Sequence, residues 1–144
     1  MTAQDILYKT ASKYIGVHEI DGPASNPQIK KWIKDAAEWL DSDDSKTAWC
    51  GCFRAAIGYE TGTGVVSAPY RAVNWINWGR SIIKRDRNIW PQGSTVIMGR
   101  PGGYHVALLD RITGDYMWLL GGNQSDSVNI SRFPISKIID IRIQ

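Results

Sequence analysis

Cys50 is the residue of this chain with the clearest potential for covalent chemistry. Thr47 can cap a helix that we expect over residues 48–61, which places Cys50 in its first turn. There the unpaired backbone N–H groups and the positive end of the helix dipole stabilise a thiolate and lower the pKa of the thiol. A thiolate that substrate can reach, with a histidine to take and return a proton, is the machinery of a cysteine peptidase.

The chain has two candidates for that histidine. His18 lies in a loop near the N-terminus, whereas His105 opens a predicted strand. If the following hairpin is symmetric about Gly114, His105 lies opposite Asn123, with Cβ atoms about 4.5–5.5 Å apart. An amide oxygen at that distance would fix the tautomer and the orientation of the imidazole. Asp110 is a competitor for this role, but strand alternation puts it on the opposite face from His105.

Each of these residues also has a purely structural interpretation. Cys50 could be a small buried side chain, and Asn123 could serve only a turn. Trp49 and Tyr104 flank the proposed nucleophile and base, where they could line a substrate groove or pack in the core. Cys52 lies about 200° around the helix from Cys50, so we expect it to face the core. Two cysteines with this spacing and two distant histidines do not match a zinc site, and we predict neither a metal nor a cofactor.

The elements that must position these residues change character along the chain. Periodic apolar positions predict helices in the first half, and short β-rich runs follow in the second half. Helices followed by consecutive strands predict an α+β domain with an antiparallel sheet. The expected helices cover residues 2–15, 27–40, 48–61 and 68–83, and the expected strands cover 94–98, 104–112, 116–121, 128–131 and 138–143.

Length and composition predict a single domain over residues 1–144, since 144 residues can bury one core without disulfides. With 43% apolar and 22% charged residues, the chain is unlike a disordered protein or a coiled coil. No stretch predicts a membrane span, and because Asp5 and Lys9 interrupt the N-terminal segment, we expect no secretory signal there. The net charge of +3 suits a polyanionic partner, cell wall or nucleic acid, without choosing between them.

Three segments in this order resemble the papain-like peptidoglycan hydrolases of the CHAP and NlpC-like families, and in particular the small single-domain endolysins of phages. They are the helix start at Trp49-Cys50-Gly51, the strand at residues 102–106 and the segment Leu120-Gly121-Gly122-Asn123-Gln124. The resemblance implies a papain-like fold in which N-terminal helices pack on a C-terminal antiparallel β-sheet. It also implies Cys50 as nucleophile, His105 as base and Asn123 as the residue that orients the base.

By the same resemblance, the chain would cleave amide bonds in the peptide part of bacterial peptidoglycan as a monomer, without nucleic acid or a stable membrane association. It would have no separate wall-binding domain, accumulate in the host cytoplasm and reach the periplasmic wall after holin-type or other release. The chain departs from the family pattern at Ala48, Cys52 and Tyr104, which affects the groove and therefore the bond that is cut.

Three alternatives remain open at this point. A cell-wall-degrading toxin delivered by a secretion apparatus would have the same features. Papain-like Cys–His sites also serve deamidases and acyltransferases. A non-enzymatic wall-binding protein would also suit the basic charge and the seven tryptophans.

Overall fold

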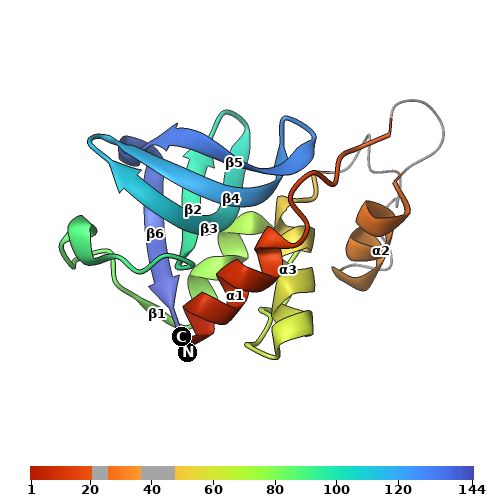
Figure 1. The fold of residues 1–144 in the computed structure, drawn as a ribbon, viewed down its shortest axis with the longest axis horizontal. Helices are drawn as coiled ribbons and strands as arrows, with labels where there is room; N and C mark the ends of the chain where they lie inside the picture. Colours follow the sequence, from red (N-terminus) through yellow and green to blue (C-terminus); the bar gives the residue numbers. More distant parts are fainter. Residues whose placement is uncertain (21–25, 37–47) are drawn as a thin grey trace.

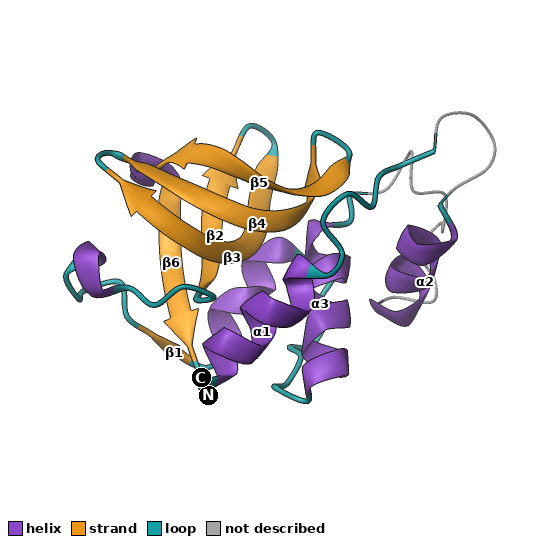
Figure 2. Ribbon diagram, in the orientation of Figure 1, coloured by secondary structure: helices purple, strands orange, loops and turns teal. Residues whose placement is uncertain are grey.

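The computed structural model describes residues 1–20, 26–36 and 48–144 of the chain. Helices occupy the N-terminal part and a six-stranded sheet the C-terminal part, so the predicted α+β class is confirmed (Figures 1 and 2). None of the helices in the described ranges combines the length and the apolar character needed to cross a membrane. The α-helices are α1 (Ala3–Ser12), α2 (Pro27–Ala36) and α3 (Cys50–Thr61), and the short 3-10 helices are η1 (Ala72–Asn77), η2 (Arg87–Ile89) and η3 (Ile135–Lys137).

The helix ends follow the capping signals in the sequence. Thr2 caps α1 by accepting a hydrogen bond from the backbone N–H of Asp5, whose side chain accepts one from Thr2 in return. Asn26 accepts hydrogen bonds from the first turn of α2, and Pro27 is its first residue. Gly62 ends α3 in the left-handed conformation, with φ of +69°. The N-cap of α3 is Trp49 rather than the predicted Thr47, and it makes no side-chain cap hydrogen bond. Thr47 itself and the end of the second predicted helix, residues 37–40, lie outside the described residues.

The sheet has the strand order β1-β6-β2-β3-β4-β5, and each pair of neighbouring strands is antiparallel. All five predicted strands are present, several of them longer than expected. The strands are β1 (Arg80–Ser81), β2 (Thr95–Arg100), β3 (Gly103–Thr113), β4 (Tyr116–Gln124), β5 (Ser127–Pro134) and β6 (Ile138–Ile143).

The fourth predicted helix, over residues 68–83, is wrong. Only Ala72–Asn77 is helical, and the chain then turns into β1, which pairs with the last residues of β6. The turn depends on Gly79, which has φ of +58° and lies so close to β6 that a Cβ atom would be 2.1 Å from the carbonyl oxygen of Ile143. The apolar periodicity was compatible with a helix, but this close approach to β6 is a tertiary contact that ends it.

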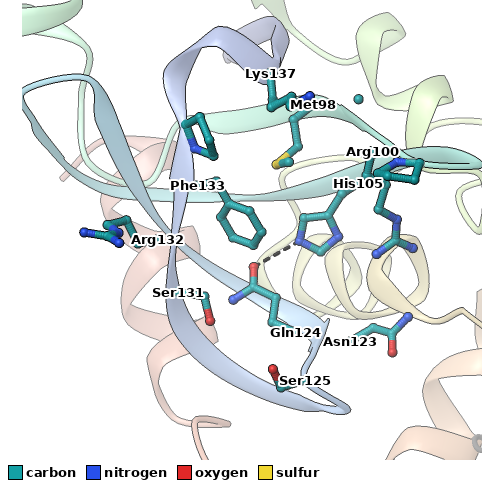
Figure 3. A pocket seen from close by; sticks show the side chains of 13 residues that line it. Met98, Arg100, His105, Asn123, Gln124, Ser125, Ser131, Arg132, Phe133 and Lys137 are labelled. Carbon is teal, nitrogen blue, oxygen red and sulfur yellow. Dashed lines mark hydrogen bonds between the residues drawn. The ribbon is translucent and has the colours of Figure 1, made fainter.

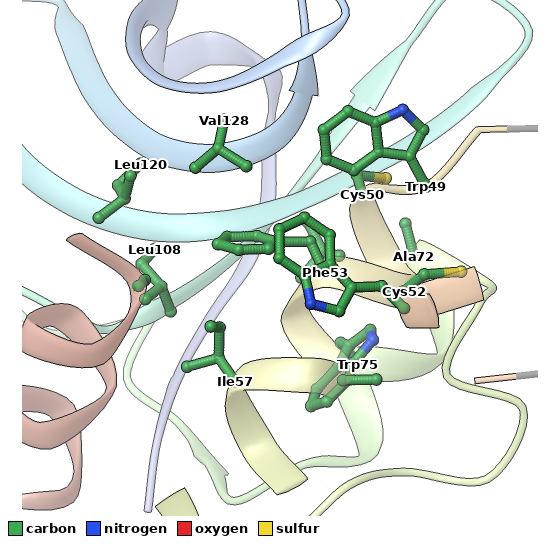
Figure 4. Close-up of a cluster of buried hydrophobic side chains, with 14 of the residues drawn as sticks. Trp49, Cys50, Cys52, Phe53, Ile57, Ala72, Trp75, Leu108, Leu120 and Val128 are labelled. Atoms are coloured by element: carbon green, nitrogen blue, oxygen red, sulfur yellow. The ribbon is translucent and has the colours of Figure 1, made fainter. Parts of the chain in front are cut away.

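The sheet is curled and has an apolar cluster on each face. One cluster lies within the curl and includes Met98, Leu109 and Ile141. The other lies between the sheet and the helices, where α3 packs against β3 and β4 through Phe53 and its neighbours (Figure 4). The second cluster holds the start of α3, with Cys50, against the sheet.

The hairpin between β3 and β4 differs from a symmetric one. Thr113 pairs with Tyr116, so the loop has two residues rather than the three expected. A bulge at Asp110 adds one residue to β3, and beyond it Leu108 pairs with Leu120, which is the register that a symmetric hairpin would have. The regular pairing of β3 with β4 ends there, before His105.

Candidate active site

Cys50 is the first residue of α3, so it lies in the first turn as predicted, although the helix begins two residues later than the expected start at residue 48. Its thiol therefore lies at the end of a helix whose first backbone N–H groups have no partner within the helix. The residue that follows must be glycine, because a Cβ atom on Gly51 would lie 2.4 Å from the carbonyl oxygen of Pro69. The Cys-Gly pair thus lets the start of the helix lie directly against the backbone of residues 69 and 70.

His105 is the group that most strongly favours the thiolate of Cys50. Burial of the thiol raises its pKa, but contact with the imidazole and the charge of His105 lower it. The backbone of Val106 and the charge of Arg100 lower it further. Together these outweigh burial, and the pKa of Cys50 lies below the ordinary value of 9.0. The structure therefore brings the predicted nucleophile and the predicted base together.

The third member of the site is Gln124, which the sequence analysis missed. Its side-chain oxygen lies 3.0 Å from Nε2 of His105 (Figure 3). Its amide group donates to the carbonyl oxygens of Leu119 and Asn129, at 3.0 and 2.9 Å, and to the side chain of Asn129 at 3.0 Å. Because backbone carbonyls hold the amide in this orientation, its oxygen must face the imidazole, and Nε2 is the nitrogen that donates.

This hydrogen bond leaves the other ring nitrogen for the thiol. Nδ1 of His105 is buried and has no partner with regular hydrogen-bond geometry among the described residues. The contact with Cys50 is therefore looser than a regular hydrogen bond, as is common for a catalytic pair before substrate binds. With Nε2 protonated and held by Gln124, Nδ1 is the atom that can accept the proton of the thiol.

Asn123, the predicted orienting residue, does not take that role. It has φ of +56°, and the pairing of β4 with β5 is interrupted between Gly121 and Gln124. This irregularity breaks the alternation of side chains along β4, so that Gln124 rather than Asn123 reaches His105. The prediction assumed regular strands up to residue 123, which is where the regularity fails.

The two glycines before Asn123 make this arrangement possible. A Cβ atom on Gly121 would lie 2.6 Å from the side-chain oxygen of Gln124, and one on Gly122 would lie 2.7 Å from the ring of Trp49. Gly121 thus leaves room for the amide that orients the base, and Gly122 lets the end of β4 pack on the residue before Cys50. The Gly-Gly-Asn-Gln sequence carried the signal for this geometry, in which the glycines and the glutamine are the essential members.

The two predicted substrate-binding residues differ in exposure. Trp49 is completely buried, packs beside Trp32 and donates a hydrogen bond of 2.8 Å to Glu19 (Figure 4). It supports the helix start from within the core, and its predicted place in a groove is wrong. Tyr104 is 45% exposed, so its side chain remains accessible on the strand that carries His105.

Cys50 and His105 are both largely enclosed, since Cys50 is 4% exposed and His105 2%. Next to the imidazole lies an open cavity of about 500 Å³, which His105, Asn123 and Gln124 line together with residues of β2 and β5 (Figure 3). Cys50 is not among its lining residues, but Arg100, whose charge also lowers the pKa of the thiol, is one of them.

The other residues with chemical potential lie outside this arrangement. Cys52 is fully buried, as predicted, and burial together with the nearby Cys50 raises its pKa to about 12. His18 is exposed, with Nδ1 3.1 Å from the carbonyl oxygen of Gly16. Asp110 is bonded to Tyr8 and Arg111 rather than to His105. Within the described ranges, no three His, Cys, Asp or Glu side chains gather closely enough to hold a metal ion.

Comparison with known proteins adds no assignment, since the chain matches no family model and no curated protein.

Proposed function

We propose that this protein is a peptidoglycan hydrolase that cleaves amide bonds in the peptide part of the bacterial cell wall, with a papain-like arrangement of helices and sheet. The observation that carries the proposal is the order of groups Cys50–His105–Gln124. A thiol with a lowered pKa lies at a helix start, beside an imidazole whose far nitrogen is held by a buried amide.

Each group has one role in the proposed reaction. Nδ1 of His105 accepts the thiol proton, and the sulfur of Cys50 attacks the carbonyl carbon of the amide. The carbonyl becomes a tetrahedral oxyanion, which we expect the backbone N–H of Cys50 to stabilise. His105 then gives its proton to the leaving amine as the C–N bond breaks, and a thioester remains on Cys50. Water, deprotonated by His105, attacks the carbonyl carbon of the thioester. The C–S bond breaks, the new acid is released, and Cys50 and His105 return to their starting protonation states.

Gln124 is a positioning residue in this scheme. It keeps the proton on Nε2 and the imidazole plane fixed while Nδ1 gains and loses a proton. When the ring is protonated, the bond from Nε2 to the amide oxygen becomes charge-assisted and strengthens. Gln124 thus stabilises the protonated imidazole while the tetrahedral intermediate is present.

Peptidoglycan as substrate rests on the sequence segments around the three groups and on the net charge of +3, which favours a polyanionic wall. Purified peptidoglycan tests the proposal directly. The protein should release amino groups from it, and iodoacetamide should abolish the release, whereas a metal chelator should not. Release that survives alkylation but is lost to the chelator would contradict the cysteine mechanism, and no release would contradict the function.

A further inference from the structure

The cavity beside His105 is lined by three cationic side chains, Arg100, Arg132 and Lys137, and by no acidic side chain of the described residues. None of the three takes part in an ion pair within the described part of the chain. The remaining polar lining consists of neutral groups, including Ser125 and Ser131. A cavity with this lining favours an anionic occupant.

The three cations are not equivalent. Arg100, at the end of β2, is half-buried, and its guanidinium lies on the side of His105 (Figure 3). It is also close enough to the thiol for its charge to favour the thiolate of Cys50. Lys137 lies near Met98, while the guanidinium of Arg132 points away from His105 and stacks on Tyr116, 4.4 Å from the ring centre. Arg100 is therefore the cation best placed to bind a group near the base.

The cavity lies within reach of the thiol, because Arg100 lines the cavity and its charge also favours the thiolate of Cys50. The acyl carbon of the scissile amide must reach the sulfur of Cys50. The cavity beside His105 can therefore hold a group carried by a residue that flanks the scissile amide. An arginine there offers two N–H groups in the geometry that a carboxylate accepts.

We propose that this cavity binds a free carboxylate of a residue that flanks the scissile amide, with Arg100 as the main specificity-determining residue and Lys137 as a second cation. This inference rests on the proposed function and defines its substrate more closely. It favours amides within the stem peptide that are flanked by a residue with a free carboxylate. The sugar–peptide link is disfavoured, because the carboxyl group of the sugar forms that link and the carboxyl group of the first residue is already part of the next amide.

The test compares native peptidoglycan with the same material after its free carboxylates have been converted to primary amides. The wild type should release amino groups from native wall at least about tenfold faster, given the strength of charge-assisted hydrogen bonds. In Arg100→Gln this ratio should fall below about threefold, and Lys137→Gln should give an intermediate ratio. The ratio cancels any change in the reactivity of Cys50, because the thiol is the same for both substrates.

Lys84→Gln is the matched control, because it removes one positive charge from an exposed site that does not line the cavity. It should keep the wild-type ratio and so exclude a general effect of wall charge on binding. A wild-type ratio near one, or a preference that persists in both Arg100→Gln and Lys137→Gln, would overturn this inference and leave the hydrolase intact. Release from neither wall preparation by the wild type would instead refute the proposed function.

Discussion

Replacing Gln124 with methionine removes the orienting hydrogen bond while keeping an unbranched side chain of similar size. Gln124 is 4% exposed, and its loss leaves two buried groups without their partner, Nε2 of His105 and the carbonyl oxygen of Leu119. At about 1–3 kcal/mol for each unpartnered buried group, unfolding becomes easier by about 2–6 kcal/mol. A domain of this kind has about 5–15 kcal/mol of stability, so the variant should be examined well below its melting temperature.

The effect on catalysis follows from the same bond. A hydrogen bond to the charged imidazole contributes about 1.5–3 kcal/mol, and each 1.36 kcal/mol is tenfold in rate. Gln124→Met should therefore lower kcat for peptidoglycan roughly 10- to 150-fold. The assay is the initial rate of amino-group release at a temperature where circular dichroism shows the variant to be folded.

Asn123→Gly provides the matched control for this prediction. Glycine tolerates the left-handed φ of +56° at this position, and the change removes a side chain that makes no hydrogen bond to His105. It should change kcat less than threefold; because Asn123 also lines the proposed substrate cavity, kcat at saturating substrate is compared rather than kcat/KM. A large loss of kcat in Asn123→Gly, together with full activity in Gln124→Met, would show that Asn123 orients His105, as the sequence predicted, and would refute that role for Gln124.

Three further variants test other parts of the structure. The rate of Cys50 alkylation should reach half its maximum below pH 9.0, and His105→Ala should move that midpoint to higher pH, because burial raises the pKa of the thiol and His105 no longer lowers it. An unchanged midpoint would contradict the pairing of Cys50 with His105. Arg54→Lys should lower the free energy of unfolding by about 2 kcal/mol, because the buried guanidinium stacks on two tryptophan rings, 4.3 and 4.8 Å from their centres, and an ammonium cannot stack in this way. A denaturant unfolding curve that matches the wild type would refute this role. Gly121→Ala should lower kcat at least tenfold by displacing the amide of Gln124, whereas Gly103→Ala, where a Cβ atom meets nothing within 4 Å, should not. Equal rates in the two variants would refute the close packing of Gly121 against Gln124.

Much of the fold could be predicted because local signals and tertiary structure agree. Thr2 and Asn26 cap their helices through bonds within one turn, and Gly62 ends α3 in a conformation that glycine adopts without strain. The strands of the second half carry enough β-branched and apolar residues to be found individually. The helix predicted over residues 68–83 failed because Gly79 lies against β6, a contact between segments far apart in the sequence.

Of the three residues that the structure brings together, two were predicted. Cys50 and His105 could be found because a helix start and a strand start are local features. The third residue depended on the register of two strands. The bulge at Asp110 offsets the shorter loop and keeps the predicted register, but the irregularity between Gly121 and Gln124 displaces the side chain that reaches His105 by one position. The spacing of residues in the sequence does not predict such irregularities, because packing on both faces of the sheet determines where a bulge forms. The burial of Trp49 likewise follows from the contact with Gly122 across the domain.

The central claim is that the sulfur of Cys50 cleaves an amide of the cell wall. Mass spectrometry of peptidoglycan fragments, after digestion by the wild type and by Cys50→Ala, tests it most directly. The account predicts that the wild type produces fragments with a new amine and a new acid, each pair heavier by one water than the intact link, and that Cys50→Ala produces none. The same fragments from Cys50→Ala at the wild-type rate would contradict it.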